Sequence, residues 1–254
     1  MSNKSLQAKA TTVSHFVSTS WPYAKTMVTS RLMGTFARAT SLSLGSFAAY
    51  RRMTDPLDVF FDLDHTILCS VTPLPITDEN GGGRNLQWFD QIDDDFPYEA
   101  NSPNTRTYLR PLSTATIYFC SVIGRVHVYT AAQKTYTDNI LKVIDPHRTL
   151  FGQVLHRDSH PDIVRKGKDL LFARGGEVGL RRSILFDDKL ANFVPQKYQN
   201  GVLVRPFTAD SVASCSQFNM AYTREALEML KICSIVLFCS VVPSGDARDI
   251  IKRL

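Results

Sequence analysis

The stretch LDVFFDLDHTIL, residues 57–68, decides the fold of this chain. It opens with a short apolar run rich in valine and phenylalanine that stops at Asp62, which is typical of a buried strand in a parallel sheet. Asp64 and Thr66 follow and complete a D-x-D-x-T pattern. Packing does not explain two carboxylates at a strand end, because unpaired charge is costly to bury. We therefore expect chemistry at this position.

Further apolar runs alternate with helix-length segments along the rest of the chain, which is the pattern of a parallel α/β sheet. Strands are predicted at residues 125–129, 152–156, 183–186 and 202–204, with a helix at 134–143. Thr130 and Asp187 follow two of these strands. Ligands of open α/β sheets bind at the carboxyl ends of the strands. The sequence thus predicts an α/β fold that gathers polar side chains at one sheet edge.

The two aspartates after the first strand suit phosphoryl transfer through a covalent intermediate. Asp62 is predicted to attack phosphorus and form an aspartyl-phosphate, while Asp64 protonates the departing oxygen and then activates water. The negatively charged nucleophile and phosphate need a cation between them. Asp187 and Asp188 follow another strand and, with Asp62 and the main-chain carbonyl of Asp64, offer the oxygen ligands that Mg²⁺ prefers. The sequence therefore predicts a Mg²⁺ site.

Two other positions are predicted to bind the phosphoryl group. Thr130, at its strand end, is expected to donate its hydroxyl to a phosphoryl oxygen. Lys168 is expected to neutralise transition-state charge and to hold the nucleophile, with Lys166 as the alternative. A dehalogenase needs neither the general acid Asp64 nor Mg²⁺, so the pattern favours cleavage of a phosphate ester over dehalogenation. Phosphomutase chemistry is a less expected alternative.

The chain resembles the FCP/NIF-type branch of the haloacid dehalogenase superfamily. That branch includes small phosphatases of the RNA polymerase II C-terminal domain and a related mitochondrial inner-membrane translocase receptor. The similarity extends over VHVYTAAQKTYTD at 126–138, Leu141 to Ser159 and Leu185 to Phe207. The resemblance implies a three-layer Rossmann-like fold over residues 55–254, with an insertion after the first strand. It also implies a phosphoric monoester hydrolase that acts on phosphoserine or phosphothreonine in phosphoproteins or phosphopeptides.

By residue, the resemblance supports the roles given to the aspartates, Thr130 and Lys168, and it adds Arg157 as a substrate contact. Two substitutions depart from the family pattern: His65 stands where Glu is common, and Lys189-Leu190 replaces Ser-Pro. Neither removes a group that the chemistry needs. We expect these departures to bear on the choice of substrate.

Residues 1–54 form a basic extension with seven Lys or Arg residues and no acid. This composition is typical of a mitochondrial transit peptide, and it predicts a mitochondrial protein, with the matrix as the expected compartment. The alternative is a Ser/Thr-rich tail with no targeting role, in a nuclear or cytoplasmic protein. Residues 55–254 hold 22 basic and 24 acidic residues, so we expect no direct nucleic-acid binding by the folded part.

The segment at about 69–110 is predicted to be an acidic insertion that acts as a cap or specificity loop, with a short hairpin near 98–109. Its seven acids and several aromatic residues raise an alternative function. In that alternative, the protein is a mitochondrial scaffold that keeps the phosphatase fold, sits in a protein complex and binds basic presequences. No apolar run reaches the roughly 20 residues of a bilayer span, so no transmembrane segment is expected.

Overall fold

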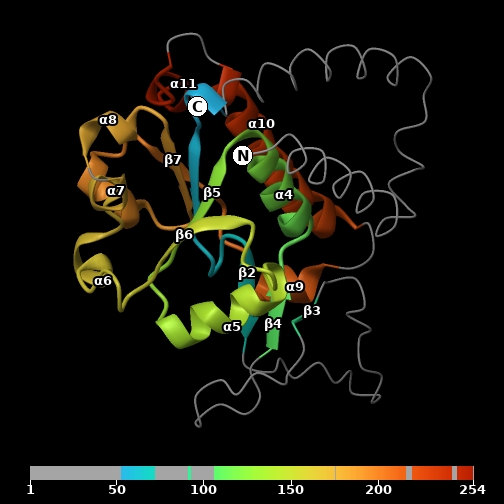
Figure 1. Ribbon diagram of the computed structural model, residues 1–254. Helices are drawn as coiled ribbons and strands as arrows, with labels where there is room; N and C mark the ends of the chain where they lie inside the picture. The colour runs from blue at the N-terminus through green and yellow to red at the C-terminus, as the bar shows by residue number, and fades with distance from the viewer. Residues whose placement is uncertain are drawn as a thin grey trace, which may run out of the picture.

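A five-stranded parallel sheet forms the centre of the protein in the computed structural model, which describes residues 53–71, 91–92, 106–174, 176–215, 219–241 and 245–253 (Figure 1). Its strands are β1 (Asp58–Phe61), β5 (Arg125–Tyr129), β6 (Phe151–Leu155), β7 (Ser183–Asp187) and β8 (Gly201–Leu203). These match the five predicted strands, with two of them displaced by one residue. The predicted α/β class is confirmed.

The strand order is β6-β5-β1-β7-β8, so the chain first builds outward on one side of β1 and then returns to build on the other. The direction of building reverses between β1 and β7, which is the point where open α/β sheets bind ligands. Phe61 pairs with Val128 of β5 and Phe186 of β7. Asp62 follows directly, and its backbone N–H donates to the Phe186 carbonyl at 3.0 Å.

Helices cover both faces of the sheet, which gives three layers as predicted (Figure 1). Alternation along β1 explains this, because Val59 and Phe61 enter one apolar core and Phe60 enters the other. The first face carries α4 (Ser113–Ile123), α5 (Lys134–Ile144) and α10 (Met220–Val241). The second carries α6 (Ile163–Lys166), α7 (Leu170–Arg174), α8 (Glu177–Leu180) and the 3₁₀ helix η1 (Leu190–Gln196). The remaining helices are α9 (Ala209–Ser214) and α11 (Arg248–Ile251).

A small antiparallel sheet of order β2-β4-β3 lies beside the main one. It consists of β2 (Leu68–Val71), β3 (Gln91–Ile92) and β4 (Arg106–Leu109), so both ends of the predicted insertion pair with each other. The hairpin expected at 98–109 is seen only through β4, whose partners are β2 and β3. Residues 72–90 and 93–105 lie outside the described residues, as do residues 1–52 of the predicted transit peptide.

The most apolar stretch near the C-terminus, residues 232–242, falls within α10 up to Val241. The buried side chains of that helix include Ile232, Ile235 and Val236, which join the core beneath β1. Among the described residues, no helix combines the length and the apolar character needed to cross a bilayer.

Candidate active site

Three carboxylates converge where β1 and β7 end. Asp62, Asp187 and Asp188 place carboxylate oxygens within 4.8 Å of one another. Asp187 is fully buried and Asp62 is 6% exposed. The register of the two strands causes this convergence, because the residues after Phe61 and Phe186 are neighbours across the sheet. The Asp64 carboxylate is not part of this group.

Lys168 provides the positive charge at the centre of the cluster. Its side chain is fully buried, with Nζ 2.6 Å from Asp62 Oδ1 and in contact with Asp187 Oδ2. The preceding Gly167 has φ +89°, and a Cβ there would lie 2.8 Å from the Ala191 carbonyl oxygen, so the turn requires glycine. Lys166 is instead exposed and paired with Asp162 at 2.6 Å. The structure thus places Lys168, and not the alternative Lys166, beside the predicted nucleophile.

Burial controls the charge states in this cluster. Burial raises the pKa of Asp62 to about 7; Lys168 opposes the rise, and the nearby Asp187 and Asp64 add to it. Burial alone lowers the pKa of Lys168, but Asp62 and Asp187 outweigh it, so the net shift is upward and the ammonium stays protonated. One ammonium does not balance three crowded carboxylates. The cluster therefore favours a further cation.

The two consecutive aspartates after β7 differ in their environments. Asp187 accepts hydrogen bonds at both of its oxygens. Asn192 Nδ2 lies 2.8 Å from Oδ1 and 2.9 Å from Oδ2, the Lys189 backbone N–H donates to Oδ1 at 2.8 Å, and Lys168 donates to Oδ2. Asp188 Oδ1 is buried and accepts no hydrogen bond from any described residue. Burial first, and Asp187 second, raise the pKa of Asp188. An open buried carboxylate oxygen beside excess negative charge fits a hard divalent cation, so these residues fit Mg²⁺.

Asp64 lies on the wall of the site and accepts a hydrogen bond from the Tyr136 hydroxyl of α5. The Tyr136 oxygen also lies 2.8 Å from Ser70 Oγ of β2, so the small sheet and α5 jointly fix the carboxylate. Burial raises the pKa of Asp64, while Tyr136 opposes the rise. A raised pKa keeps more of the acid protonated near neutral pH, as a general acid requires. Tyr136 was not predicted as a site residue; its place within the 126–138 motif was the available signal.

Asp62, Asp64 and Lys168 face a cavity of about 490 Å³ that is also lined by Thr130, Arg157 and residues of α5 and α6, whereas Asp187 and Asp188 lie behind its wall. Thr130 Oγ1 accepts from the Ala132 backbone N–H at 3.1 Å, which fixes the hydroxyl at the cavity wall. Arg157 Nε donates to the Ala131 carbonyl at 2.9 Å, so the guanidinium is held at the opening while its side chain is exposed. The cavity thus brings together Asp62, Asp64, Thr130, Lys168 and Arg157, which were all predicted from the sequence.

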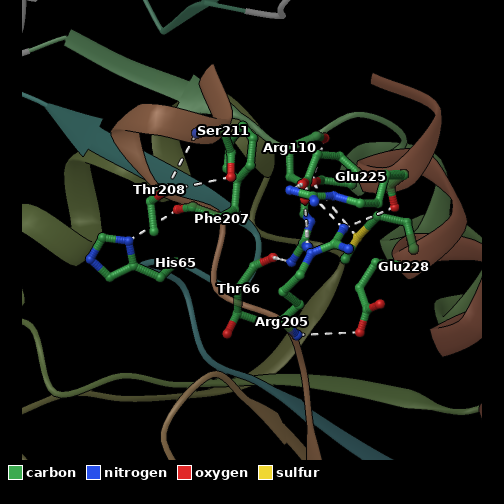
Figure 2. Close-up of polar contacts among 12 residues, drawn as sticks. His65, Thr66, Arg110, Arg205, Phe207, Thr208, Ser211, Glu225 and Glu228 are labelled. Carbon is green, nitrogen blue, oxygen red and sulfur yellow. Dashed lines mark hydrogen bonds and ion pairs between the residues drawn. The ribbon is translucent and has the colours of Figure 1, made fainter. Parts of the chain in front are cut away.

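The turn that carries Asp62 and Asp64 is also held through its residues His65 and Thr66 (Figure 2). His65, at φ 61°, exchanges hydrogen bonds with Phe207: the Phe207 N–H donates to the His65 carbonyl at 2.7 Å, and His65 Nδ1 lies 3.0 Å from the Phe207 carbonyl. Arg110 Nη1 donates to the Thr66 carbonyl at 3.2 Å. These contacts hold the turn from segments that are distant in the sequence.

Arg110 in turn is held by a buried carboxylate of α10. Its Nη2 lies 2.6 Å from Glu225 Oε2, and the two side chains are 0% and 1% exposed. Arg205 also reaches Glu225, with Nη2 3.1 Å from Oε1 (Figure 2). Sequence reasoning missed this support, because nothing in the local pattern links two residues 115 positions apart.

Residues 57–234 match the family model described as NLI interacting factor-like phosphatase. The chain belongs to this family. The match spans more than two thirds of the sequence and confirms the FCP/NIF-type resemblance. The link to the mitochondrial translocase receptor stays a prediction. Among curated proteins, none matches the chain.

Solved structures of RNA polymerase II CTD phosphatases share this family's fold. "The Structure of Fcp1, an essential RNA polymerase II CTD phosphatase" is 20% identical with a TM-score of 0.50, covering 76% of this chain and 53% of that one. A fission yeast Fcp1 variant bound to beryllium fluoride is 18% identical with a TM-score of 0.49, covering 72% and 52%. The match thus spans about half of each of those chains.

Proposed function

We propose that this member of the phosphatase family hydrolyses phosphoserine or phosphothreonine in proteins, with Mg²⁺ as cofactor and an aspartyl-phosphate on Asp62 as intermediate. The observation that carries the proposal is the Asp62 carboxylate at the cavity wall, 2.6 Å from the buried ammonium of Lys168, with Asp64 lining the same cavity. A nucleophile, its counter-charge and a separate acid are the groups that this chemistry needs.

In the first step, an Asp62 oxygen attacks phosphorus and the bond from phosphorus to the serine or threonine oxygen breaks. Protonated Asp64 donates its proton to that leaving oxygen, which its raised pKa favours. The Thr130 hydroxyl binds a phosphoryl oxygen, and the Lys168 ammonium offsets the charge that develops on the phosphoryl group.

In the second step, the Asp64 carboxylate takes a proton from water, and the water oxygen attacks phosphorus. The bond between phosphorus and the Asp62 oxygen breaks, which releases inorganic phosphate and restores both aspartates to their starting states. Tyr136 holds Asp64 in one position through both steps, so a single side chain serves as acid and then as base.

Mg²⁺ would be held by Asp62 and Asp188, with Asp187 as the adjoining carboxylate, and it supplies charge neutralisation between nucleophile and phosphate. The Asp64 main-chain carbonyl remains the predicted fourth ligand. The hydrogen bonds of Asp187 give it a second role, which is to anchor Lys168 and the start of η1. The open oxygen of Asp188 supports its assignment as a ligand.

The test is hydrolysis of an aryl phosphate and of phosphoserine peptides by the full chain, with Mg²⁺ or with a chelator. We expect Mg²⁺-dependent release of phosphate that the Asp62→Asn variant lacks while its circular dichroism spectrum is unchanged. If the folded wild-type chain is as inert as Asp62→Asn on all substrates, the phosphatase proposal fails. The mitochondrial scaffold, which rests on the acidic insertion, then becomes the better hypothesis.

We also propose that residues 1–54 direct the protein to mitochondria. Their basic, acid-free composition supports this. Imaging of the full chain fused to a fluorescent protein at its C-terminus tests it, with Arg31→Glu and Arg38→Glu together as the control. A wild-type distribution that is cytoplasmic or nuclear contradicts the proposal.

A further inference from the structure

Two cations line the active-site cavity without a part in the chemistry just described. Arg157 follows β6 and Lys189 follows β7. Lys189 stands where the resembled family has serine, so it is a feature of this chain. Its backbone N–H donates to Asp187 at 2.8 Å, which fixes the residue at the edge of the site while its side chain is exposed.

The charges of these two side chains are available to a ligand. Lys189 Nζ makes no hydrogen bond or ion pair with any described residue, and Arg157 uses only Nε, toward the Ala131 carbonyl. Two exposed acids on the helices that line the cavity, or directly before them, already have basic partners. Asp138 binds Lys134 and Arg148, and Asp162 binds Arg165 and Lys166. Lys189 and Arg157, in contrast, form no ion pair with any acid in the described part of the chain.

The sheet order sets the spacing of the two cations. β5 and β1 lie between β6 and β7, so the segments that carry Arg157 and Lys189 are three strand spacings apart, or about 14 Å. Asp62 ends β1 and lies between them. An extended peptide advances about 3.3 Å per residue, so 14 Å corresponds to about four residues. β1 is one strand spacing from β7 and two from β6, or about 5 and 10 Å. A phosphorylated residue over Asp62 would therefore place a residue one or two positions away near Lys189 on one side, and a residue about three positions away near Arg157 on the other.

We propose that Lys189 and Arg157 bind anionic groups that flank the scissile phosphate, so that the enzyme prefers phosphopeptides with carboxylates or further phosphates one or two residues away on one side and about three on the other. This inference rests on the proposed function and names its substrate class. Lys189 also acts on Asp188 and Asp64, whose pKa values its charge lowers. Such an effect on the catalytic groups is the same for every peptide, whereas a flanking subsite discriminates between them.

The experiment compares four peptides that share one phosphoserine. The variable residues lie two positions from it on one side and three on the other, and each peptide is made in both orders. These residues are neutral, glutamate, non-hydrolysable phosphonate or lysine, which separates the effect of carboxylates from that of phosphates. We expect kcat/KM at low ionic strength to be about threefold higher per flanking anion, or about tenfold for two, over the neutral peptide. The preference should shrink as salt screens these exposed charges.

Variants of single residues test whether Lys189 causes the preference for flanking anions. Lys189→Gln should lower the ratio of kcat/KM between glutamate-flanked and neutral peptides about threefold, and Lys189→Glu should turn the preference toward the lysine-flanked peptide. Lys197→Gln, at an exposed lysine that does not line the cavity, is the matched control and should keep the ratio. Equal loss on all peptides in Lys189→Gln overturns the subsite.

The failures of the two proposals are distinguishable. Hydrolysis of the neutral peptide with no preference for flanking anions overturns this inference and leaves the proposed function intact. Hydrolysis of an aryl phosphate but of no phosphopeptide overturns the protein substrate. Binding of the same peptides to Asp62→Asn, followed by fluorescence anisotropy, reads the subsite without turnover. Equal affinity for all four peptides there overturns it as well.

Discussion

Replacing Glu225 by glutamine tests whether the turn that carries Asp62 and Asp64 depends on the buried ion pair between Glu225 and Arg110. The Glu225 carboxylate accepts from Arg110 at 2.6 Å and from Arg205 at 3.1 Å. Glutamine keeps the shape of the side chain but removes its charge, so the fully buried guanidinium of Arg110 loses its counter-charge. A buried guanidinium cannot shed its proton to escape this penalty.

The expected loss follows from the burial of both partners. Breaking a buried pair by changing one partner costs about 3–5 kcal/mol. A domain of this size loses about 2–4 °C in Tm for each kcal/mol, so Glu225→Gln should unfold about 6–20 °C below the wild type. The kcat should fall as well, because Arg110 holds the carbonyl of Thr66 in the turn that carries Asp62 and Asp64.

Thermal and urea unfolding of the full chain, followed by circular dichroism, measure this effect. Glu228→Gln is the matched control, with the same chemical change on the same helix. Glu228 is paired with Lys231 at 3.3 Å, and that lysine side chain is 47% exposed. Glu228 Oε1 also accepts from the Arg205 backbone N–H at 3.3 Å, which the glutamine oxygen can still do, so the control should lose less than about 1 kcal/mol. If Glu225→Gln loses no more than Glu228→Gln, the reasoning is wrong. The double change Arg110→Met with Glu225→Leu should recover part of the stability.

Three further changes probe the site itself. Asp188→Asn should raise the Tm of the metal-free protein, because it removes a half-buried negative charge whose Oδ1 is buried and accepts no hydrogen bond from any described residue. It should also abolish the increase in Tm that Mg²⁺ gives the wild type, and an unchanged Mg²⁺ response would exclude Asp188 as a ligand. Tyr136→Phe removes a hydrogen bond that lowers the pKa of Asp64, so the pKa of Asp64 should rise. The alkaline limb of the plot of kcat/KM against pH should then move to higher pH, because Asp64 stays protonated to higher pH. A shift to lower pH would contradict Asp64 as the acid. Gly167→Ala places a Cβ at φ +89° and 2.8 Å from a carbonyl oxygen. It should lower the free energy of unfolding, measured with urea, by about 1–3 kcal/mol, and it should lower kcat by displacing Lys168. Wild-type stability would show that the turn adapts.

The sheet and the positions of Asp62 and Asp64 were predictable because both depend on local sequence. The apolar run before Asp62 indicates a buried strand, and parallel strands bring their carboxyl ends to one edge. The choice between Lys166 and Lys168 was not predictable from spacing. It depends on the left-handed turn at Gly167 and on burial against two aspartates, which only the folded chain creates.

The supporting contacts were less accessible to sequence reasoning for the same physical reason. Asn192 donates to Asp187 from the first turn of η1, and Tyr136 reaches Asp64 from α5. Both are ordinary polar residues on helices, and their roles appear only when the helices pack against the strand ends. Arg110 and Glu225 come from elements that share no local pattern.

The pairing of β2 with β4 has a consequence for how this chain accommodates its insertion. Val71 lies opposite Arg106 in the antiparallel ladder, so the two ends of the segment between them are held side by side by a closed pair of strands. Chain added within such a closed segment costs little entropy, about 0.6 kcal/mol for each doubling of its length. The turn that carries Asp62 and Asp64 ends at Leu68, the first residue of β2, whereas the insertion leaves from Val71 at the other end of that strand. Evolution is therefore free to lengthen the chain between Val71 and Arg106 while Ser70, Arg110 and the geometry of Asp62 and Asp64 stay the same.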